Sequence, residues 1–321
     1  MVTLLLLLAL GWRAPASEPA PLPPVESSPF LLGVLRRDAV VTPFAAFDGK
    51  DWDNPWPADL RSLELPIDLE SVPRKWWGKG GRLEPVTAWT DGVNRGPLQP
   101  SRLTMIRSMC ATRLALVTDY KPQQPAPPPA VQPYPKDGLA VWGDQRVEPV
   151  VPLSAAAPGW TRAATLLPVP VAKAEDIAIG AFTGWDHPFS KAERRKAPVE
   201  IEAMYSAPMD EPGWTAYYIE AVKRYPLRPE DEGCGLITSV SGWIVAPPEL
   251  SPSATTLVAR VTYCDRRGVT YMLPLGLVKT RGRTYWAYQL SGYGREGYLI
   301  VRPTPKNIVH ELNYSAGNCP F

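Results

Sequence analysis

The chain has 321 residues, of which 34 are Lys or Arg and 32 are Asp or Glu, so its formal net charge is +2. A charge this close to zero provides no long-range attraction to nucleic acid or to an anionic lipid surface, which argues against both as partners. Proline accounts for 39 residues, about 12% against a usual value of about 5%. Because proline interrupts helices and central strands, this content predicts short strands and many loops.

Residues 1–16 have the pattern of a secretory signal peptide. An apolar run covers Val2–Trp12 and is followed by Arg13 and the small-x-small triplet Ala14-Pro15-Ala16. A run of about 11 residues has the length of a signal-peptide core, whereas a membrane span takes about 20 residues. No basic residue precedes the run, and no later run is as long as a membrane span. We predict export with cleavage after Ala16; the alternatives are an uncleaved anchor and a buried N-terminal helix.

Two proline-rich segments divide the rest of the chain. Residues 17–29 are rich in Pro, Ser and Glu, which is typical of an extended tether. Residues 121–136 contain seven prolines and favour polyproline II geometry. We interpret this second segment as a linker or a long surface loop rather than as a ligand for an aromatic groove. It separates an N-terminal β region, 30–120, from a C-terminal antiparallel β region, 137–321.

Short apolar runs predict strands in the N-terminal region. Leu32–Arg36 and Val40–Phe47 flank the polar pair Arg37-Asp38, which is the pattern of a β-hairpin. Glu84–Trp89 is a further predicted strand, and Leu103–Val117 is a longer run of the same β pattern that contains Cys110. No extended stretch without Pro and Gly repeats with the period of a helix.

The C-terminal region continues the β pattern. Runs at 139–142 and 147–151 flank Gly143-Asp144-Gln145 and predict another hairpin. Val199–Tyr205 alternates apolar and polar side chains, as a half-buried strand does. Further strands are predicted at 214–225, 236–245, 255–263, 269–275, 284–290 and 298–302, and short helices at 172–182 and 190–196.

Many short strands with few helices between them are typical of antiparallel β proteins. We therefore predict a mainly β fold, an antiparallel sandwich or barrel with few short helices, whose two β regions share one core or flank it.

The chain has an even number of cysteines, which in an exported protein predicts disulfides. Cys234 precedes one predicted strand and Cys264 follows the next. If these strands are antiparallel about a loop near residue 250, the two cysteines lie opposite each other, at a spacing that a disulfide can bridge. Cys110 and Cys319 then pair by elimination and tie the C-terminus to the N-terminal region. The alternative is four buried thiols.

Tryptophans are the candidate ligand-binding residues. A flat indole stacks on the apolar C–H face of a sugar ring, and the most exposable pair, Trp76 and Trp77, lies beside three glycines. Trp52 and Trp56 flank a polar loop and are the other two candidates. The alternative is that all four bury their large rings in an ordinary β core.

Asp48, Asp51 and Asp53 form a candidate calcium site on the glycine-containing segment 47–57. Calcium prefers such oxygen ligands, but the spacing differs from that of an EF-hand loop and no glutamate closes it. Asp is also a common turn residue, so a plain turn is the competing interpretation. The chain has no zinc-binding spacing and no nucleotide-binding glycine loop, so we predict no cofactor.

Catalytic patterns are weak. The chain has only His187 and His310, and it lacks a G-x-S-x-G elbow. A glycosidase needs two facing carboxylates, and Glu200, Glu202 and Glu220 are placed on the polar face of predicted strands, where simple alternation also puts them.

The sequence therefore favours a secreted or periplasmic, non-enzymatic binding or structural protein of unknown ligand. Its partner would be a glycan or an envelope protein, the latter bound through an exposed sheet edge. The alternative is a carbohydrate-active enzyme, similar in chemistry to glycoside hydrolases, that uses an Asp/Glu pair beside exposed Trp.

Overall fold

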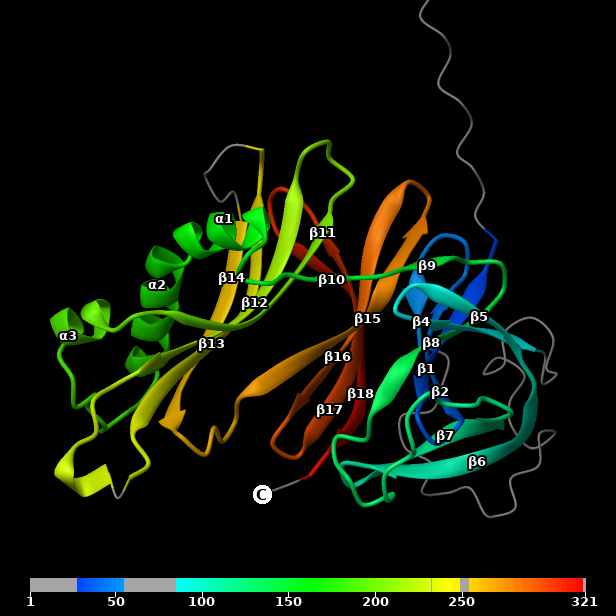
Figure 1. Ribbon diagram of the computed structural model, residues 1–321, viewed down its shortest axis with the longest axis horizontal. Coiled ribbons are helices and arrows are strands. Elements are labelled where there is room, and N and C mark those ends of the chain that lie inside the picture. Colours follow the sequence, from blue (N-terminus) through cyan, green and yellow to red (C-terminus); the bar gives the residue numbers. More distant parts are fainter. Residues whose placement is uncertain (1–27, 55–84, 232, 249–253, 320–321) are drawn as a thin grey trace, which may run out of the picture.

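The computed structural model describes residues 28–54, 85–231, 233–248 and 254–319. The predicted mainly β fold is confirmed, because 53% of the described residues are in strands and 12% are in helices. The described residues form three antiparallel sheets and three short α-helices, and none of these sheets closes into a barrel (Figure 1). The architecture is that of a layered β-sandwich.

Sheet A is the N-terminal sheet, with the strand order β5-β4-β8-β1-β2-β7-β6 and with β3 paired to β2. Its strands are β1 (Phe30–Arg36), β2 (Val40–Phe47), β3 (Trp52–Asp53), β4 (Val86–Thr90), β5 (Val93–Leu98), β6 (Pro100–Ser108), β7 (Ala111–Thr118) and β8 (Lys136–Trp142). The sheet curls around a small core of its own, which includes Leu35, Val86 and Leu116 (Figure 1). Because β8 follows the proline-rich segment, sheet A takes strands from both sides of that segment.

The C-terminal half of the chain builds two five-stranded sheets. Sheet B has the order β18-β17-β16-β15-β9 and sheet C the order β10-β11-β12-β13-β14. The strands of sheet B are β9 (Val147–Glu148), β15 (Thr270–Thr280), β16 (Arg283–Gly292), β17 (Arg295–Pro303) and β18 (Ile308–Asn318). Those of sheet C are β10 (Val151–Pro152), β11 (Glu200–Pro208), β12 (Thr215–Arg224), β13 (Leu236–Ala246) and β14 (Ala254–Tyr263).

Sheet B is the central layer and packs on both of its faces. Successive side chains of a strand point to opposite faces, so Tyr285 and Ala287 of β16 join the core shared with sheet A. Trp286 and Tyr288 of the same strand join the core shared with sheet C. All four side chains are at most 3% exposed. The run of apolar residues in β16 therefore reflects a strand that is covered on two sides.

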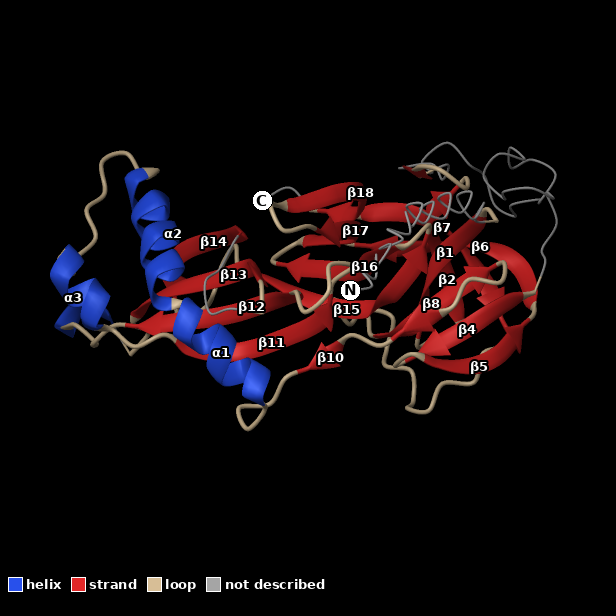
Figure 2. Ribbon diagram, turned by 90° about the horizontal axis from the view of Figure 1, so that it is seen from above, coloured by secondary structure: helices blue, strands red, loops and turns tan. Residues whose placement is uncertain are grey.

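Two helices, α1 (Pro158–Leu166) and α2 (Pro168–Gly180), cover the outer face of sheet C, and α3 (Lys191–Lys196) lies beside α2 (Figure 2). Leu167 and Val171 pack there against Ile219 and Ile244. A capping box at Ser190 starts α3, with the Ser190 hydroxyl accepting from the Glu193 amide. No helix in the described part of the chain is long and apolar enough to cross a membrane.

Most predicted strands are present, and the differences from the prediction have physical causes. The hairpin of β1 and β2 is confirmed. The longer apolar run 103–117 forms two strands, β6 and β7, because Met109 and Cys110 adopt positive φ and turn the chain. The predicted hairpin at 139–151 is wrong. Both edges of β8 are already occupied, by β1 and β4, so β9 pairs with β15 in sheet B.

The predicted helices are present at shifted bounds, and other elements were not expected. Helix α2 begins at Pro168, four residues before the predicted start, and α3 is close to its predicted range. The elements that were not predicted include α1, β5 and β18. Strand β18 (Ile308–Asn318) mixes polar and apolar residues, because it is an edge strand with one side in solvent.

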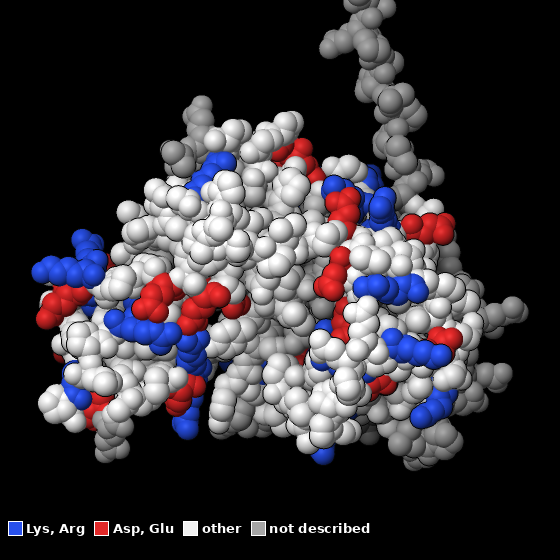
Figure 3. Space-filling model, in the orientation of Figure 1, with Lys and Arg blue, Asp and Glu red and all other residues white. Residues whose placement is uncertain are grey.

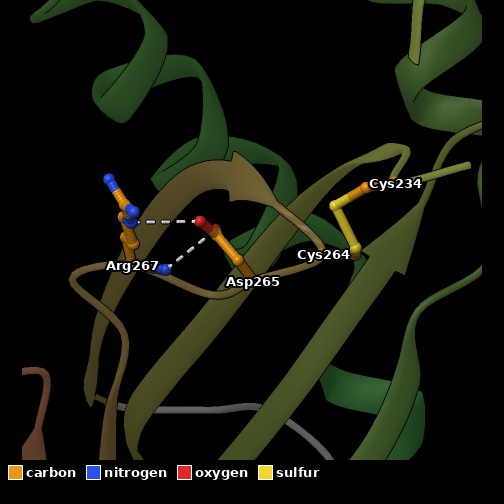
Figure 4. The surroundings of a disulfide bond; sticks show 4 residues. All are labelled: Cys234, Cys264, Asp265 and Arg267. Atoms are coloured by element: carbon orange, nitrogen blue, oxygen red, sulfur yellow. Dashed lines mark hydrogen bonds and ion pairs between the residues drawn. A yellow bond between two sulfur atoms is a disulfide. The ribbon is translucent and has the colours of Figure 1, made fainter. Parts of the chain in front are cut away.

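Both disulfides have the pairing that the sequence predicts. Cys234 and Cys264, with Cα atoms 5.3 Å apart, join the start of β13 to the end of β14 (Figure 4). The register of these strands pairs Leu236 with Tyr263, so the two cysteines flank the last pair of the ladder. Cys110 and Cys319 join the β6–β7 turn of sheet A to the residue that follows β18.

Candidate functional site

A cleft of about 550 Å³ lies between sheets B and C. One wall comes from β13 and β14 and the other from β16, β17 and β18. Edge strands β14 and β18 lie on the same side of the molecule (Figure 2). The volume falls within the range of about 300–1,000 Å³ that is usual for small-molecule sites.

The inner end of the cleft is aromatic. Tyr218, Trp243 and Tyr288 line it, and each is at most 4% exposed. The Trp243 ring lies 4.9 Å from that of Trp286 and 5.2 Å from that of Tyr218, both in edge-on contacts. These large side chains fill the space between the two sheets at this end and fix their separation.

The cleft exists because side-chain size falls along one face of β13. Trp243, Ser241 and Ser239 are alternate residues and therefore share the face that looks toward sheet B. Trp243 fills the space between the sheets, whereas the two serines do not, and on sheet B Gly297 contributes no side chain to the lining. The two sheets thus stay apart beyond the aromatic cluster.

The Ser239 hydroxyl is buried and has no hydrogen-bond partner. Ser239 is 7% exposed and lines the cleft. Two residues along the strand, the Ser241 hydroxyl is hydrogen-bonded to the Tyr218 hydroxyl. A hydroxyl can both donate and accept, so the Ser239 hydroxyl in the wall of the cleft is available to hydrogen-bond a ligand.

The outer part of the cleft is basic. Arg260 of β14, Arg295 of β17 and His310 of β18 are exposed and line it. Among the described lining residues Glu296 is the one acid, and its carboxylate turns away toward sheet A. There it accepts from Lys136 Nζ at 3.0 Å and from the Tyr298 hydroxyl at 2.5 Å. The charge that faces the cleft is therefore positive.

A pair of carboxylates with opposite pKa shifts lies beside the cleft. Glu220 is 8% exposed and accepts from the Met272 amide at 2.6 Å. Burial raises its pKa to about 7. Glu202 binds the Arg266 guanidinium at 2.5 and 2.6 Å, and this hydrogen bonding lowers its pKa. Acidic and basic side chains lie intermixed over sheet C beside a hollow (Figure 3).

The carboxylates that the sequence groups together are thus divided by the structure. Glu200 and Glu202 both form ion pairs with Arg224, at 3.0 and 3.1 Å, on the surface of sheet C. Glu220 is a cross-strand partner of Ser241, which lines the cleft, so it lies next to the site although it does not itself line it.

Of the four candidate tryptophans, Trp52 lies within the described residues, and its ring is packed. It contacts Phe30, Phe47 and Tyr285 at centroid distances of 5.5, 5.2 and 5.4 Å, in the core between sheets A and B. Trp52 is thus partly buried among three other rings. Trp56, Trp76 and Trp77 lie outside the described residues.

The candidate calcium ligands serve as turn residues. The Asp48 carboxylate accepts from the amides of Lys50 and Asp51 at 2.7 and 2.8 Å. Asp53 accepts from the amide of Asn54 at 2.7 Å. Within the ranges that the structure describes, no three His, Cys, Asp or Glu side chains come together as a metal site.

His187 belongs to a separate buried network behind sheet C. Its ring lies 5.0 Å from the ring of Tyr225, and its Nδ1 accepts from the Phe189 amide at 3.1 Å. Burial lowers its pKa. The buried Glu175 carboxylate accepts from Lys223 at 2.7 Å and also from the Tyr225 hydroxyl. This network connects α2 with sheet C on the face opposite the cleft.

The residues that form the cleft carry no motif in the sequence. Ser239, Arg260, Arg295 and His310 come from four strands, which the fold brings together. The one available signal is the pair Ser239 and Ser241, which places two hydroxyls on one face of an otherwise apolar strand.

Comparison of this chain with models of protein families, with curated proteins and with solved structures finds no match in any of the three. The site must therefore be interpreted from its own geometry and chemistry.

Proposed function

We propose that the protein is an exported, non-enzymatic binding protein and that it holds a saccharide ligand in the cleft between sheets B and C. The observation that carries this proposal is the cleft itself, with the buried and unpartnered Ser239 hydroxyl in its wall. A saccharide has hydroxyls for the polar walls and an apolar C–H face for the aromatic inner end, so its chemistry suits both parts of the lining.

Export is supported by two independent features. Residues 1–16 have the signal-peptide pattern. All four cysteines are in disulfides, which form and persist in oxidising compartments such as the periplasm and the cell exterior.

The lining of the cleft supports binding rather than hydrolysis. Cleavage of a glycosidic bond needs an acid and a second carboxylate on either side of the bond. Glu296, the one acid of the described lining, is bound to Lys136 on the far side of sheet B. The remaining polar side chains, Ser239 and Ser241 among them, bind and orient a ligand without acid–base chemistry.

A carbohydrate-active enzyme is the second candidate, favoured by Glu220 and Glu202. A buried carboxyl with a raised pKa suits a general acid, and an ionised neighbour suits a base or nucleophile. In this alternative the sugar would extend from the cleft toward Glu220, past Ser241.

A panel of defined oligosaccharides, titrated by calorimetry into the secreted protein, tests the proposal. We expect binding to at least one member and no release of reducing ends. Ser239→Leu fills the cleft and should abolish binding. Ser101→Leu, the same substitution at an exposed position of β6 in sheet A, should retain it.

Three results would contradict the proposal. One is binding to no saccharide in the panel, and another is equal binding by the Ser239→Leu variant with unchanged folding. Release of reducing ends that is lost in Glu220→Gln would instead establish the enzyme.

A further inference from the structure

The cleft contains two arginines without an acidic partner, whereas arginines elsewhere on sheet C and its flanking loops are paired. Arg224, Arg266 and Arg228 bind Glu200, Glu202 and Asp231, and Arg267 binds Asp265 in the β14–β15 turn (Figure 4). Within the described residues, Arg260 and Arg295 belong to no such ion pair. The protein thus leaves two guanidinium groups uncompensated where the cleft opens.

These two arginines stand on opposite walls. Arg260 is on β14, the edge strand of sheet C, and Arg295 is the first residue of β17 in sheet B. A guanidinium group binds a carboxylate through two parallel hydrogen bonds, which gives both strength and orientation. A ligand that enters between the sheets therefore meets a carboxylate-binding group on each side.

Neutral polar groups also line the cleft. Ser239 lies opposite Arg260 on the neighbouring strand, Thr256 lies opposite Trp243, and Asn313 and Ser315 of β18 add an amide and a hydroxyl. Together with the arginines and the aromatic end, these groups match a ring that carries hydroxyls, a carboxylate at its edge and an apolar C–H face.

We infer that the ligand of the cleft is an acidic saccharide of the uronic-acid type, whose carboxylates bind Arg260 and Arg295 while its hydroxyls bind the walls. This inference rests on the proposed function, since it specifies the saccharide class. An acidic peptide has the charge but lacks the ring hydroxyls, and it is the competing ligand that the experiment distinguishes.

The test compares three probes by calorimetry on the full exported protein. Trigalacturonic acid carries the carboxylates, its methyl ester has the same rings without charge, and triglutamate has comparable charge without rings. We expect trigalacturonic acid to bind at least about tenfold more tightly than the ester, which corresponds to about 1.4 kcal/mol. We expect the preference to decrease as salt is added, because exposed charges are screened, and triglutamate not to bind.

The variant Arg260→Gln/Arg295→Gln should lose this preference and bind the acid and the ester equally. The control Arg102→Gln/Arg107→Gln removes the same charge from exposed positions of β6 and should retain the preference. Because both pairs are exposed, we expect all variants to unfold at the wild-type temperature.

Each failure has its own meaning. Equal binding of acid and ester by the wild type overturns the inference and leaves the proposed function standing. Triglutamate binding as tight as that of trigalacturonic acid overturns the saccharide class in favour of an acidic peptide. Failure of both saccharide probes and of every neutral saccharide in the panel overturns the inference and the proposed function together.

Discussion

The two faces of sheet B differ in how completely they are closed. Toward sheet A, a continuous core that includes Phe44, Leu139 and Tyr298 fills the interface. Covalent and ionic links reinforce it, namely the Cys110–Cys319 disulfide and the buried Lys136–Glu296 pair. Toward sheet C, the aromatic cluster fills one end and the cleft opens beyond it.

This difference indicates a division of roles within one sheet. Charged side chains that face sheet A have partners inside the protein, as when Arg113 donates to the backbone carbonyls of Ala316 and Ser315. The polar groups that face the cleft include an unpartnered hydroxyl and two unpaired guanidinium groups within the described residues. We therefore expect the face toward sheet A to serve mainly the stability of the fold and the face toward sheet C to bind the ligand proposed above.

Removing the disulfide between sheets A and B should have the largest effect on stability. The Cys110–Cys319 bond spans 209 residues, whereas Cys234–Cys264 spans 30. In the chain-entropy picture these closures contribute about 5 and about 4 kcal/mol. Cys110→Ser/Cys319→Ser should therefore lower the free energy of unfolding more than Cys234→Ser/Cys264→Ser, as measured by denaturant unfolding. The reverse order would contradict the assignment of the A–B face as the more strongly reinforced one.

Breaking the buried ion pair of the A–B interface should rank next. The side chains of Lys136 and Glu296 are at most 1% exposed. Lys136→Met leaves a buried carboxylate without its cation, which costs about 3–5 kcal/mol of unfolding free energy. The control Arg302→Met breaks the Arg302–Glu311 pair, whose side chains are each 23% exposed, and should cost at most about 1 kcal/mol. Similar losses of unfolding free energy in Lys136→Met and Arg302→Met would mean that the buried Glu296 carboxylate does not need the charge of Lys136 for its stability.

On the other side of sheet B, Glu220 should make stability depend on pH. Burial raises its pKa from the usual 4.5 to about 7. Between these values the folded state holds a proton that the unfolded state has released, so the contribution of Glu220 to stability falls as pH rises from about 4.5 to 7. The full difference is about 3 kcal/mol.

Glu220→Gln should remove this decline, measured as the free energy of unfolding at pH 4.5 and pH 7.5. Glu202→Gln is the opposite control, because a lowered pKa gives stability that is lost as pH falls. If the free energy of unfolding of Glu220→Gln still fell between pH 4.5 and pH 7.5 as in the wild type, the group with the raised pKa would be one other than Glu220.

The sequence predicts the fold better than the site, because the two depend on different information. Strand positions and the disulfide pairing follow from local runs and from one antiparallel register, as Cys234 and Cys264 show. Which sheet a strand joins depends on residues far apart in the sequence. The residues around Gly143 have the pattern of a hairpin turn, but β8 pairs with β1 on one edge and with β4 on the other, so β9 cannot pair with it. The central position of sheet B, with Trp286 and Tyr285 buried on opposite faces, depends on packing that no single run specifies.

The cleft is harder to predict for the same reason. Tryptophans draw attention in the sequence, but Trp52 is a packed side chain between sheets A and B. The cleft comes instead from small residues at 239 and 241, where a run of ordinary strand residues leaves a space. A small residue in a strand cannot be recognised from the sequence as part of a cleft, because the cleft exists only once the opposite sheet is packed against the strand.

The smallest expected effects are those of replacing the two serines of β13, and they should have opposite signs. The Ser239 hydroxyl has no partner, whereas the Ser241 hydroxyl is hydrogen-bonded to Tyr218. Ser239→Ala removes an unsatisfied buried group and should raise the free energy of unfolding by up to about 1 kcal/mol, while weakening ligand binding. Ser241→Ala removes a made hydrogen bond and should lower it by about 1 kcal/mol.

Denaturant unfolding of these two variants, with ligand titration of each, completes the comparison of the two faces. If Ser239 served only the fold, Ser239→Ala would destabilise the protein as Ser241→Ala does, and binding would not change. A variant that is more stable and binds less is the result expected when a buried hydroxyl is kept for a ligand, because the folded protein alone then bears the cost of burying that hydroxyl without a partner.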